Sequence, residues 1–201
     1  MIFITSDLSL PPVDRREVVR YMGAREASAE LSALLDSCIE ETNDCFSPRV
    51  CSMEIPICLS ENGVELPFGA VESRSLRRHL EGCDQAVLFA ATVGIEIDRH
   101  IAKYSRLSPA RALCLQALGT ERVEALCDRF CEALASTCAA RGLCVTPRFS
   151  PGYGDLPLLI QRDLFRLLDC PAKIGVTLND SLLMSPTKSV TAMVGMKGAN
   201  K

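Results

Sequence analysis

The segment from Arg148 to Asp155 has the residue types needed to bind a small polar ligand. It reads Arg-Phe-Ser-Pro-Gly-Tyr-Gly-Asp. Gly152 and Gly154 permit backbone conformations that a side chain would forbid, and they let a ligand approach bare main-chain N–H groups. Arg148 adds a permanently charged guanidinium group, whose paired N–H groups can bind one carboxylate. The segment could therefore hold the amino-acid group of a zwitterionic ligand beside a flat heterocycle. The alternative is a structural turn whose arginine pairs with a neighbouring acid.

The glycine pattern does not match the two common phosphate-binding motifs. Pro157 stands where a Rossmann fingerprint would need its third glycine, and no Gly-Lys-Ser or Gly-Lys-Thr ending marks a P-loop. Glycine spacing alone therefore predicts no nucleotide site.

Other reactive residues indicate packing rather than chemistry. His100, with Asp98 nearby, falls on a predicted helix and is interpreted as a surface or capping residue. Cys127, Cys131 and Cys138 share one helical face, which favours core packing over a metal or an iron–sulfur cluster. No nucleophile with a matched base can be argued from sequence spacing, so we predict no catalytic residue and no metal site.

A long helical region is expected before the Arg148 segment, over 95–141, with interruptions near Ser108-Pro109 and at Gly119. Periodicity places apolar residues on one side of its second half. The opposite, polar side would carry Glu121, Asp128, Arg129 and Glu132.

The remaining elements are predicted from periodicity and from turn residues. Helices are expected over 14–22, 26–42, 73–80 and 158–168. Extended segments are expected over 50–59, 64–66, 86–93, 143–147, 175–178 and 189–194, with a hairpin turn at 61–63. The continuous apolar run over 86–93 is typical of a strand buried on both faces.

Helices and strands are mixed without the regular alternation of a doubly wound sheet. We therefore predict an α+β fold with a twisted, largely antiparallel sheet flanked by helices. No linker-like segment divides the chain, so residues 1–201 are predicted to form a single domain.

Composition narrows the functional class. A formal net charge of -3 and a pI of about 5.5 argue against nucleic-acid binding. The N-terminus lacks the features of a signal peptide, and the longest apolar run is too short to span a membrane. The 11 cysteines are odd in number and form no C-x-x-C pair, which favours reduced thiols over disulfides or zinc sites. We expect a cytoplasmic protein.

Two blocks in the C-terminal third resemble a known family, the reactivation (activation) domain of cobalamin-dependent methionine synthase. The first block is Arg148-x-x-Pro151-Gly152-Tyr153. The second, 175–191, is similar to that domain's Leu-Thr-x-Ser-x-x-Met-x-Pro-x-x-Ser-Val-Ser segment. A weaker similarity lies in the acidic and alanine-containing helix predicted at 127–135. The resemblance is specific over about 122–194 and only general over 1–121.

The resemblance implies a site for S-adenosylmethionine. Arg148 would bind its carboxylate, and Pro151, Gly152 and Tyr153, together with Gly154, would shape the groove beneath the sulfonium and adenosine. Further residues of the second block would support this groove: Met184, Pro186 and Ser189.

The chain also departs from the family pattern. The usual Pro-Ala-Cys-Pro after Gly-Tyr is replaced by Gly154-Asp155-Leu156-Pro157, and the family's tyrosine-containing strand and last helix are absent from 1–201. Asp155 could pair with the ligand's ammonium or ribose hydroxyls, or it could cap the following helix.

The implied function is that of an accessory protein without catalytic residues, which presents S-adenosylmethionine for reductive remethylation of cob(II)alamin. Its partner would be a cobalamin-binding methionine synthase or corrinoid protein, with a flavodoxin- or ferredoxin-like electron donor. Positioning the sulfonium methyl group would supply the rate enhancement, up to ~7–11 kcal/mol in well-oriented systems. The alternative is a docking or chaperone module for a corrinoid protein that binds no S-adenosylmethionine. An autonomous methyltransferase would need a Rossmann turn, and a thiol or iron–sulfur redox protein would be coloured.

Overall fold

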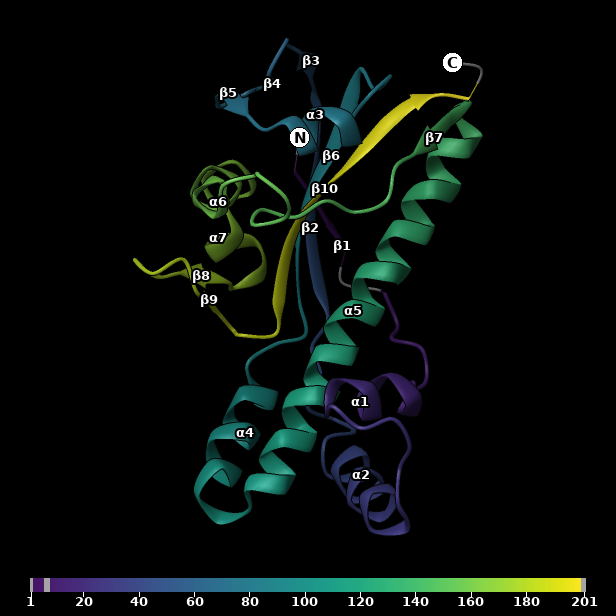
Figure 1. Ribbon diagram of the computed structural model, residues 1–201, viewed down its shortest axis with the longest axis vertical. Coiled ribbons are helices and arrows are strands. Elements are labelled where there is room, and N and C mark those ends of the chain that lie inside the picture. Colours follow the sequence, from purple (N-terminus) through teal and green to yellow (C-terminus); the bar gives the residue numbers. More distant parts are fainter. Residues whose placement is uncertain (1, 6–7, 200–201) are drawn as a thin grey trace.

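A five-stranded antiparallel sheet forms the centre of the computed structural model, which describes residues 2–5 and 8–199 (Figure 1). Its strands follow the order β1-β2-β6-β10-β7. Their bounds are Ile2–Thr5 (β1), Arg49–Pro56 (β2), Gln85–Thr92 (β6), Ser189–Gly198 (β10) and Leu143–Val145 (β7). The short β7 leads directly into the Arg148 segment.

The central strand β6 is buried from Ala86 to Thr92, as its continuous apolar sequence predicted. It pairs antiparallel with β2 on one side and β10 on the other, so Phe89 lies opposite both Ser52 and Ala192. A strand covered on both faces can be apolar at every position, because neither side of it meets water.

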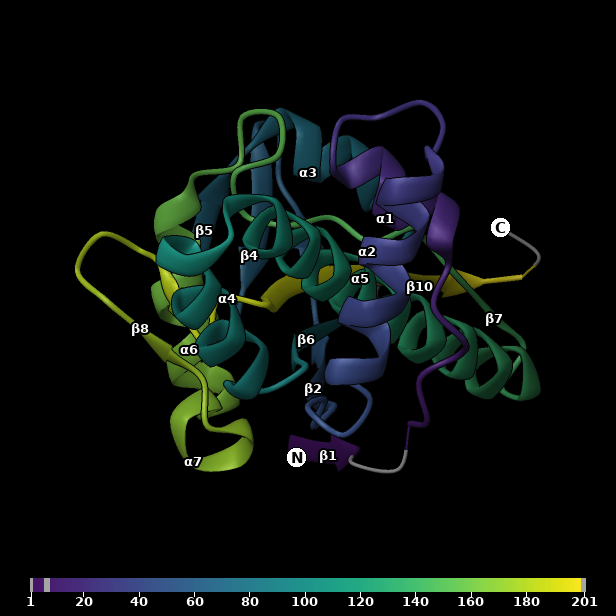
Figure 2. The ribbon, with the colours of Figure 1, turned by 90° about the horizontal axis from the view of Figure 1, so that it is seen from below.

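Four helices cover one face of the sheet: α1 (Arg15–Tyr21), α2 (Ala29–Glu41), α4 (Glu96–Leu107) and α5 (Pro109–Ala140). Figure 1 shows the long α5 running along this face, and Figure 2 shows α2 and α4 on either side of it. The starts of α1 and α2 are fixed by side-chain caps, since Asp14 accepts from the Glu17 N–H and Ser28 from the Leu31 N–H.

The other face carries shorter elements. A three-stranded sheet consists of β3 (Cys58–Leu59), β4 (Gly63–Leu66) and β5 (Gly69–Glu72), and α3 (Arg74–His79) follows it. A 3₁₀ turn (Leu158–Ile160), α6 (Gln161–Leu168), α7 (Cys170–Ile174) and the hairpin β8–β9 (Thr177–Leu178 and Met184–Ser185) complete this side. Leu76, Leu164 and Ile174 pack with Leu88 of β6 in a second apolar cluster.

The α+β class with a largely antiparallel sheet is therefore confirmed. Most predicted elements are present with shifted ends: the helix expected over 26–42 begins at Ala29, and the strand expected over 50–59 divides after Pro56. Strands β1 and β5 and helix α7 were not predicted.

The predicted interruption at Gly119 was wrong, because α5 continues through it. A Cβ atom there would lie 3.0 Å from Cγ of Lys188 and 3.1 Å from Ile97. The Lys188 stem crosses the helix at this point, and its Nζ donates to Gln116 at 2.7 Å and to Thr120 at 3.0 Å. Close packing against Lys188 explains this glycine without a break in the helix.

The predicted solvent exposure of Glu121 was also wrong. Its side chain is 6% exposed and pairs with Arg122, whose side chain is 5% exposed, at 2.5 Å. Arg122 donates to the carbonyl oxygens of Pro11 and Pro12, and Glu121 accepts from the Asp14 N–H at 3.0 Å. This buried pair attaches the segment before α1 to the middle of α5.

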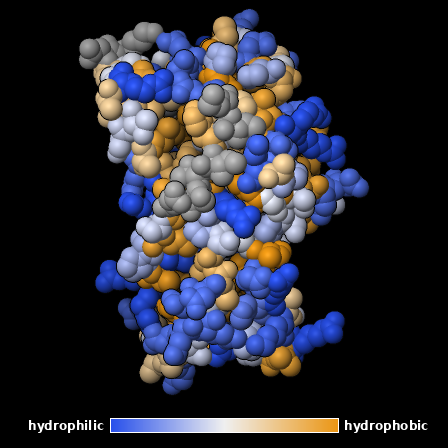
Figure 3. Space-filling view, turned by 180° about the vertical axis from the view of Figure 1, so that it is seen from behind, coloured by the Kyte–Doolittle hydropathy of each residue, from blue (hydrophilic) through white to orange (hydrophobic). Residues whose placement is uncertain are grey.

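Hydrophilic residues dominate the end of the molecule formed by α1, α2 and α4 on the face seen in Figure 3. In the part of the chain that the structure describes, no helix is both long and apolar enough to cross a membrane.

Candidate functional site

Arg148 lies on an extended segment that continues the edge of the sheet after β7. Phe149 exchanges two backbone hydrogen bonds with Met193 of β10, at 2.9 and 2.8 Å. This pairing directs the Arg148 side chain towards α5, where Nη1 lies 3.0 Å from Glu124 Oε2 and Nη2 lies 2.7 Å from Asp128 Oδ1. The Arg148 side chain is 24% exposed, so it is partly accessible while both acids pair with its guanidinium.

The turn that follows Arg148 is closed by its own backbone. The Gly152 N–H donates to the Leu156 carbonyl at 2.9 Å, and the Leu156 N–H donates to the Tyr153 carbonyl at 3.0 Å. Gly152 has a φ of 91°, a left-handed conformation that glycine adopts without strain. The turn leaves the Tyr153 ring 59% exposed, with its edge against Phe149.

A cavity of about 600 Å³ opens between this turn, α5 and β10. Ligand pockets commonly have volumes of about 300–1,000 Å³. Both charge signs are present in its wall, because Arg148, Glu124 and Asp128 all contribute. Its other lining residues are Cys131, Thr146, Pro147, Ser150, Pro151, Tyr153, Gln161, Met184, Ser189, Val190 and Thr191.

Two buried polar atoms in this wall have no hydrogen-bond partner within the described protein. They are Oε1 of Gln161, at the start of α6, and Oγ1 of Thr191, in β10. Such atoms are rare in folded proteins, and each calls for a physical explanation. The atoms themselves are shielded from solvent, but both belong to residues that line the cavity, so a ligand there could supply the missing partners after a side-chain rotation.

Five of the predicted site residues line the cavity: Arg148, Pro151, Tyr153, Met184 and Ser189. The structure thus brings the two sequence blocks together, although α6 and α7 separate them in the chain. The structure also places Glu124, Asp128, Cys131, Gln161 and Thr191 here, which the sequence prediction had not included. A polar residue within an apolar strand was the signal available for Thr191.

The other predicted residues lie outside this lining. The Gly154 position is packed against α3, since a Cβ there would lie 2.5 Å from the Ser75 hydroxyl oxygen. Pro186 is buried after a cis peptide bond and accepts from the Ser189 hydroxyl through its carbonyl at 2.8 Å. The backbone of Gly152 is exposed beside Leu158.

Asp155 points away from the cavity and caps a helix. Its carboxylate accepts from the Ser73 hydroxyl at 2.5 Å and from the N–H groups of Arg74 and Ser75 at 2.9 and 3.0 Å. These three bonds hold the pKa of Asp155 well below its ordinary value. The structure therefore favours the capping alternative, but for α3 rather than for the helix that follows Asp155.

Among the described residues, no group of three or more His, Cys, Asp and Glu side chains is arranged to hold a metal ion. The eleven cysteines are free thiols, and Cys127 and Cys138 are buried in the core as their helical spacing predicted.

Most residues that line the cavity fall in a segment that matches the model of one protein family. The family model described as the activation domain of vitamin B12 dependent methionine synthase matches residues 144–200, which contain Arg148, Gln161 and Thr191. The match begins after the helical segment at 127–135. No curated protein sequence matches the chain.

The fold agrees with the sequence match. The chain is similar to the crystal structure of the MetH reactivation domain bound to AdoHcy, with a TM-score of 0.61 and 16% sequence identity, over 88% of this chain and 68% of that chain. In its C-terminal sequence and in its fold, the chain is thus similar to the activation domain of vitamin B12 dependent methionine synthase.

Proposed function

We propose that this chain binds S-adenosylmethionine in the cavity beside Arg148 and presents it to a corrinoid carried by a partner protein. The observation that carries the proposal is the pair of partnerless polar atoms, on Gln161 and Thr191, in a cavity whose wall also offers a guanidinium and two carboxylates. The similar MetH domain was crystallised with AdoHcy, a ligand that has the same amino-acid and adenosine groups as S-adenosylmethionine.

The charges in the wall fit a zwitterionic amino-acid group. Arg148 would bind the ligand carboxylate through its fork, while Glu124 and Asp128 would face the ammonium group. In the absence of ligand both acids pair with Arg148, so binding would extend these two ion pairs to a network of Arg148, Glu124, Asp128 and the ligand's carboxylate and ammonium groups. Because the acids already fix the guanidinium, little side-chain entropy would be lost on binding.

The rim of the cavity fits a partner protein. Tyr153 is 59% exposed, Leu183, directly before the lining residue Met184, is 65% exposed, and Leu159, two residues before the lining residue Gln161, is 54% exposed. Exposed apolar side chains that gather beside a cavity are typical of contact surfaces. We propose that this rim docks on the corrinoid-carrying protein.

The chain's own contribution would be to position the methyl donor and to exclude water. The partner's corrinoid would accept the methyl group, with one electron from a flavodoxin- or ferredoxin-like donor. No acid, base or nucleophile of this chain is required, and orienting the reactants can contribute up to ~7–11 kcal/mol. We propose that the reaction takes place in the cytoplasm, where the free thiols would stay reduced.

We propose that the site belongs to one domain comprising residues 1–201. Support comes from β6 and β10, whose alternate residues enter both apolar clusters: Phe89 and Ala192 face α5, while Leu88 and Met193 face α6. Neither cluster would remain covered if the chain divided at the sheet.

Calorimetry with S-adenosylmethionine tests the proposal. We expect binding by the wild type and a loss of roughly 10- to 100-fold for Arg148→Ala, because a charge-assisted pair contributes about 1.5–3 kcal/mol. Arg141→Ala is the matched control, since Arg141 forms a two-bond pair with Glu54 outside the cavity lining. Equal binding by wild type and Arg148→Ala would contradict the proposal.

The partnerless atoms give an independent test. Thr191→Val keeps the shape of the side chain and removes its hydroxyl group, so we expect weaker ligand binding and an unchanged or slightly higher stability of the free protein. Thr137→Val is the control, because the Thr137 hydroxyl is exposed and bonded to the Ala133 carbonyl. Unaltered affinity in Thr191→Val would show that the ligand does not reach this hydroxyl.

One observation favours the alternative, a corrinoid-docking module that binds no S-adenosylmethionine. Arg148 is already paired with Glu124 and Asp128, as a purely structural arginine would be. This alternative predicts that a corrinoid protein is bound equally well with and without S-adenosylmethionine, and that Arg148→Ala weakens this complex directly.

A further inference from the structure

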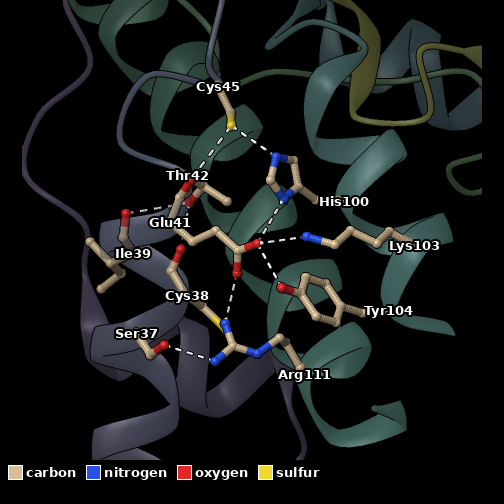
Figure 4. A network of polar contacts seen from close by, with 10 residues as sticks. All are labelled: Ser37, Cys38, Ile39, Glu41, Thr42, Cys45, His100, Lys103, Tyr104 and Arg111. Atoms are coloured by element: carbon tan, nitrogen blue, oxygen red, sulfur yellow. Dashed lines mark hydrogen bonds and ion pairs between the residues drawn. The ribbon is translucent and has the colours of Figure 1, made fainter. Parts of the chain in front are cut away.

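A cysteine, a histidine and a glutamate form a contact chain at the polar end of the molecule, away from the cavity beside Arg148. Cys45 Sγ lies 3.3 Å from His100 Nε2, and His100 Nδ1 lies 3.4 Å from Glu41 Oε1 (Figure 4). Glu41 ends α2, Cys45 follows it in a turn, and His100 comes from α4. The two ring nitrogens therefore face a thiol and a carboxylate on opposite sides.

The carboxylate of Glu41 is held in place by several donors. Tyr104 donates to Oε1 at 2.7 Å, and Arg111 donates to Oε2 at 2.8 Å. Burial alone would raise the pKa of Glu41, but the hydrogen bonds from Tyr104 and Lys103 and the charges of Lys103 and Arg111 outweigh it and lower this pKa. Glu41 is thus an ionised anchor for the imidazole.

This order of groups is the one that general-base activation of a thiol requires. The imidazole can take the thiol proton at Nε2, and the carboxylate beside Nδ1 orients the ring and stabilises the imidazolium that forms. His100 Nδ1 is buried and has no hydrogen-bond partner in the resting structure, although the Glu41 carboxylate lies 3.4 Å away. Bonds of this kind are often long before a reactant binds, and they shorten when charge develops.

The resting thiol needs such a base. Burial, followed by the negative charges of Glu96, Asp44 and Glu41, raises the pKa of Cys45 above its ordinary value. A protonated thiol is a poor nucleophile, and reaction would depend on proton transfer at the moment of attack.

We propose that Cys45 is a base-assisted thiol that forms mixed disulfides with low-molecular-weight disulfides. The thiol proton moves to His100 Nε2 while the Cys45 sulfur attacks one sulfur of the disulfide R–S–S–R. The Cys45–S–S–R bond forms, the original S–S bond breaks, and the leaving thiolate takes the proton from His100 to become RSH. The Cys45 sulfur is oxidised and the departing sulfur is reduced, so the exchange needs no other reactant.

The reactant class follows from access. Cys45 is only partly exposed, between the turn after α2 and the start of α4, so a compact disulfide can reach it more readily than a protein disulfide can. The charged groups that act on the thiol are the acids Glu96, Asp44 and Glu41, which favours an uncharged disulfide such as 2-hydroxyethyl disulfide over one that carries carboxylates.

The chain supplies its own reference thiols. Cys58 and Cys144 are more exposed than Cys45. The sequence has two histidines, and His79 contacts the Pro147 carbonyl and the Thr146 hydroxyl instead of a thiol. Exposure alone therefore predicts faster reaction at Cys58 and Cys144, whereas base assistance predicts faster reaction at Cys45.

Brief exposure of the intact protein to 2-hydroxyethyl disulfide, followed by peptide mass spectrometry, decides between them. We expect 2-mercaptoethanol to be attached to Cys45 about tenfold or more faster than to Cys58 and Cys144, a modest share of the 10²–10⁴-fold that a positioned base can supply. His100→Gln should remove this advantage and leave the two reference thiols unchanged. His79→Gln should alter none of the three rates.

A rate at Cys45 that is no faster than at Cys58 and Cys144 overturns the proposal, and this comparison needs only the wild type. So does an unchanged Cys45 rate in a folded His100→Gln variant. Binding of S-adenosylmethionine is a separate measurement at a separate site, so either proposal can fail alone.

Discussion

Ser73 and Asp155 are 82 residues apart in the sequence, and the Ser73 hydroxyl donates to the Asp155 carboxylate at 2.5 Å. Ser73 is itself the N-cap of α3, since its hydroxyl oxygen accepts from the Leu76 N–H at 3.0 Å. Asp155 adds a second acceptor from outside the helix, for the N–H groups of Arg74 and Ser75. These bonds attach the turn after Arg148 to the N-terminus of α3, the helix that follows the three-stranded sheet.

Replacement of Asp155 by alanine should lower the melting temperature, because two N–H groups at the start of α3 lose their acceptor. The effect should depend on pH. The folded-state pKa lies below the unfolded value of about 3.9, so the stabilisation is present above pH 4 and is lost as the pH falls further.

Thermal unfolding of wild type and Asp155→Ala between pH 7 and pH 2.5 tests this expectation. The difference in melting temperature should be largest above pH 5 and should shrink below pH 4. Asp44→Asn, at an exposed carboxylate, provides the control. A difference that does not change with pH would show that the charge of Asp155 contributes nothing.

The two roles considered for Asp155 show where sequence reasoning ends. A carboxylate after a glycine turn can bind a ligand or cap a helix, and the residues that decide between these roles, Ser73 to Ser75, are distant in the chain. Periodicity did predict the buried strand β6, because burial on both faces leaves a continuous apolar run. It failed at Gly119, since the Lys188 stem that requires a glycine there comes from the residue before β10, far away in the sequence.

The cavity could be predicted only in part for the same reason. Arg148, Pro151 and Tyr153 were predicted because they form a compact motif. Asp128 was expected to lie on an ordinary polar helix surface, and Glu124 was not singled out. Nothing in local sequence shows that an extended segment some twenty residues later directs an arginine onto these two acids. Gln161 and Thr191 emerge as candidates only when burial and hydrogen bonding are known.

Replacement of either Glu121 or Arg122 should lower the free energy of unfolding, because the two side chains form a buried ion pair. Arg122→Met leaves the Glu121 carboxylate buried without its partner, and we expect a loss of about 3–5 kcal/mol in the free energy of unfolding, measured by urea titration. Glu121→Gln should cost less, because the amide can still accept from Arg122 and from the Asp14 N–H.

The exposed pair formed by Arg129 and Glu132 is the matched control, and Arg129→Met should cost less than about 1 kcal/mol. Similar small losses for Arg122→Met and Arg129→Met would mean that the segment before α1 is not held by this contact.

Gly154→Ala should destabilise the turn by about 1–3 kcal/mol, since the new methyl group would lie 2.5 Å from Oγ and 2.8 Å from Cβ of Ser75 and the backbone φ is +55°. Adding Ser75→Gly removes the steric conflict and retains the N–H that Asp155 accepts from. In urea titrations, the double variant should therefore be more stable than the sum of the two single changes predicts. Strict additivity would indicate that the left-handed backbone, rather than the contact with Ser75, accounts for the loss.

The thiol of Cys131 faces the proposed methyl donor and should be nearly inert. Burial, with the charge of Asp128, raises its pKa to about 11 against the opposing charge of Arg148. Its thiolate fraction at pH 8 is then about one part in a thousand. A thiolate beside a sulfonium would itself accept the methyl group, and the raised pKa keeps Cys131 in the protonated form that does not.

Labelling with iodoacetamide at pH 8 should accordingly modify Cys131 roughly a hundredfold more slowly than exposed Cys144, and the rate at Cys131 should rise about tenfold per pH unit towards pH 11. Saturating S-adenosylmethionine should slow labelling of Cys131 further without affecting Cys144, because only Cys131 lines the cavity. Rapid labelling of Cys131 at pH 8, or labelling that ligand does not slow, would place this thiol outside the site where the methyl donor is proposed to bind.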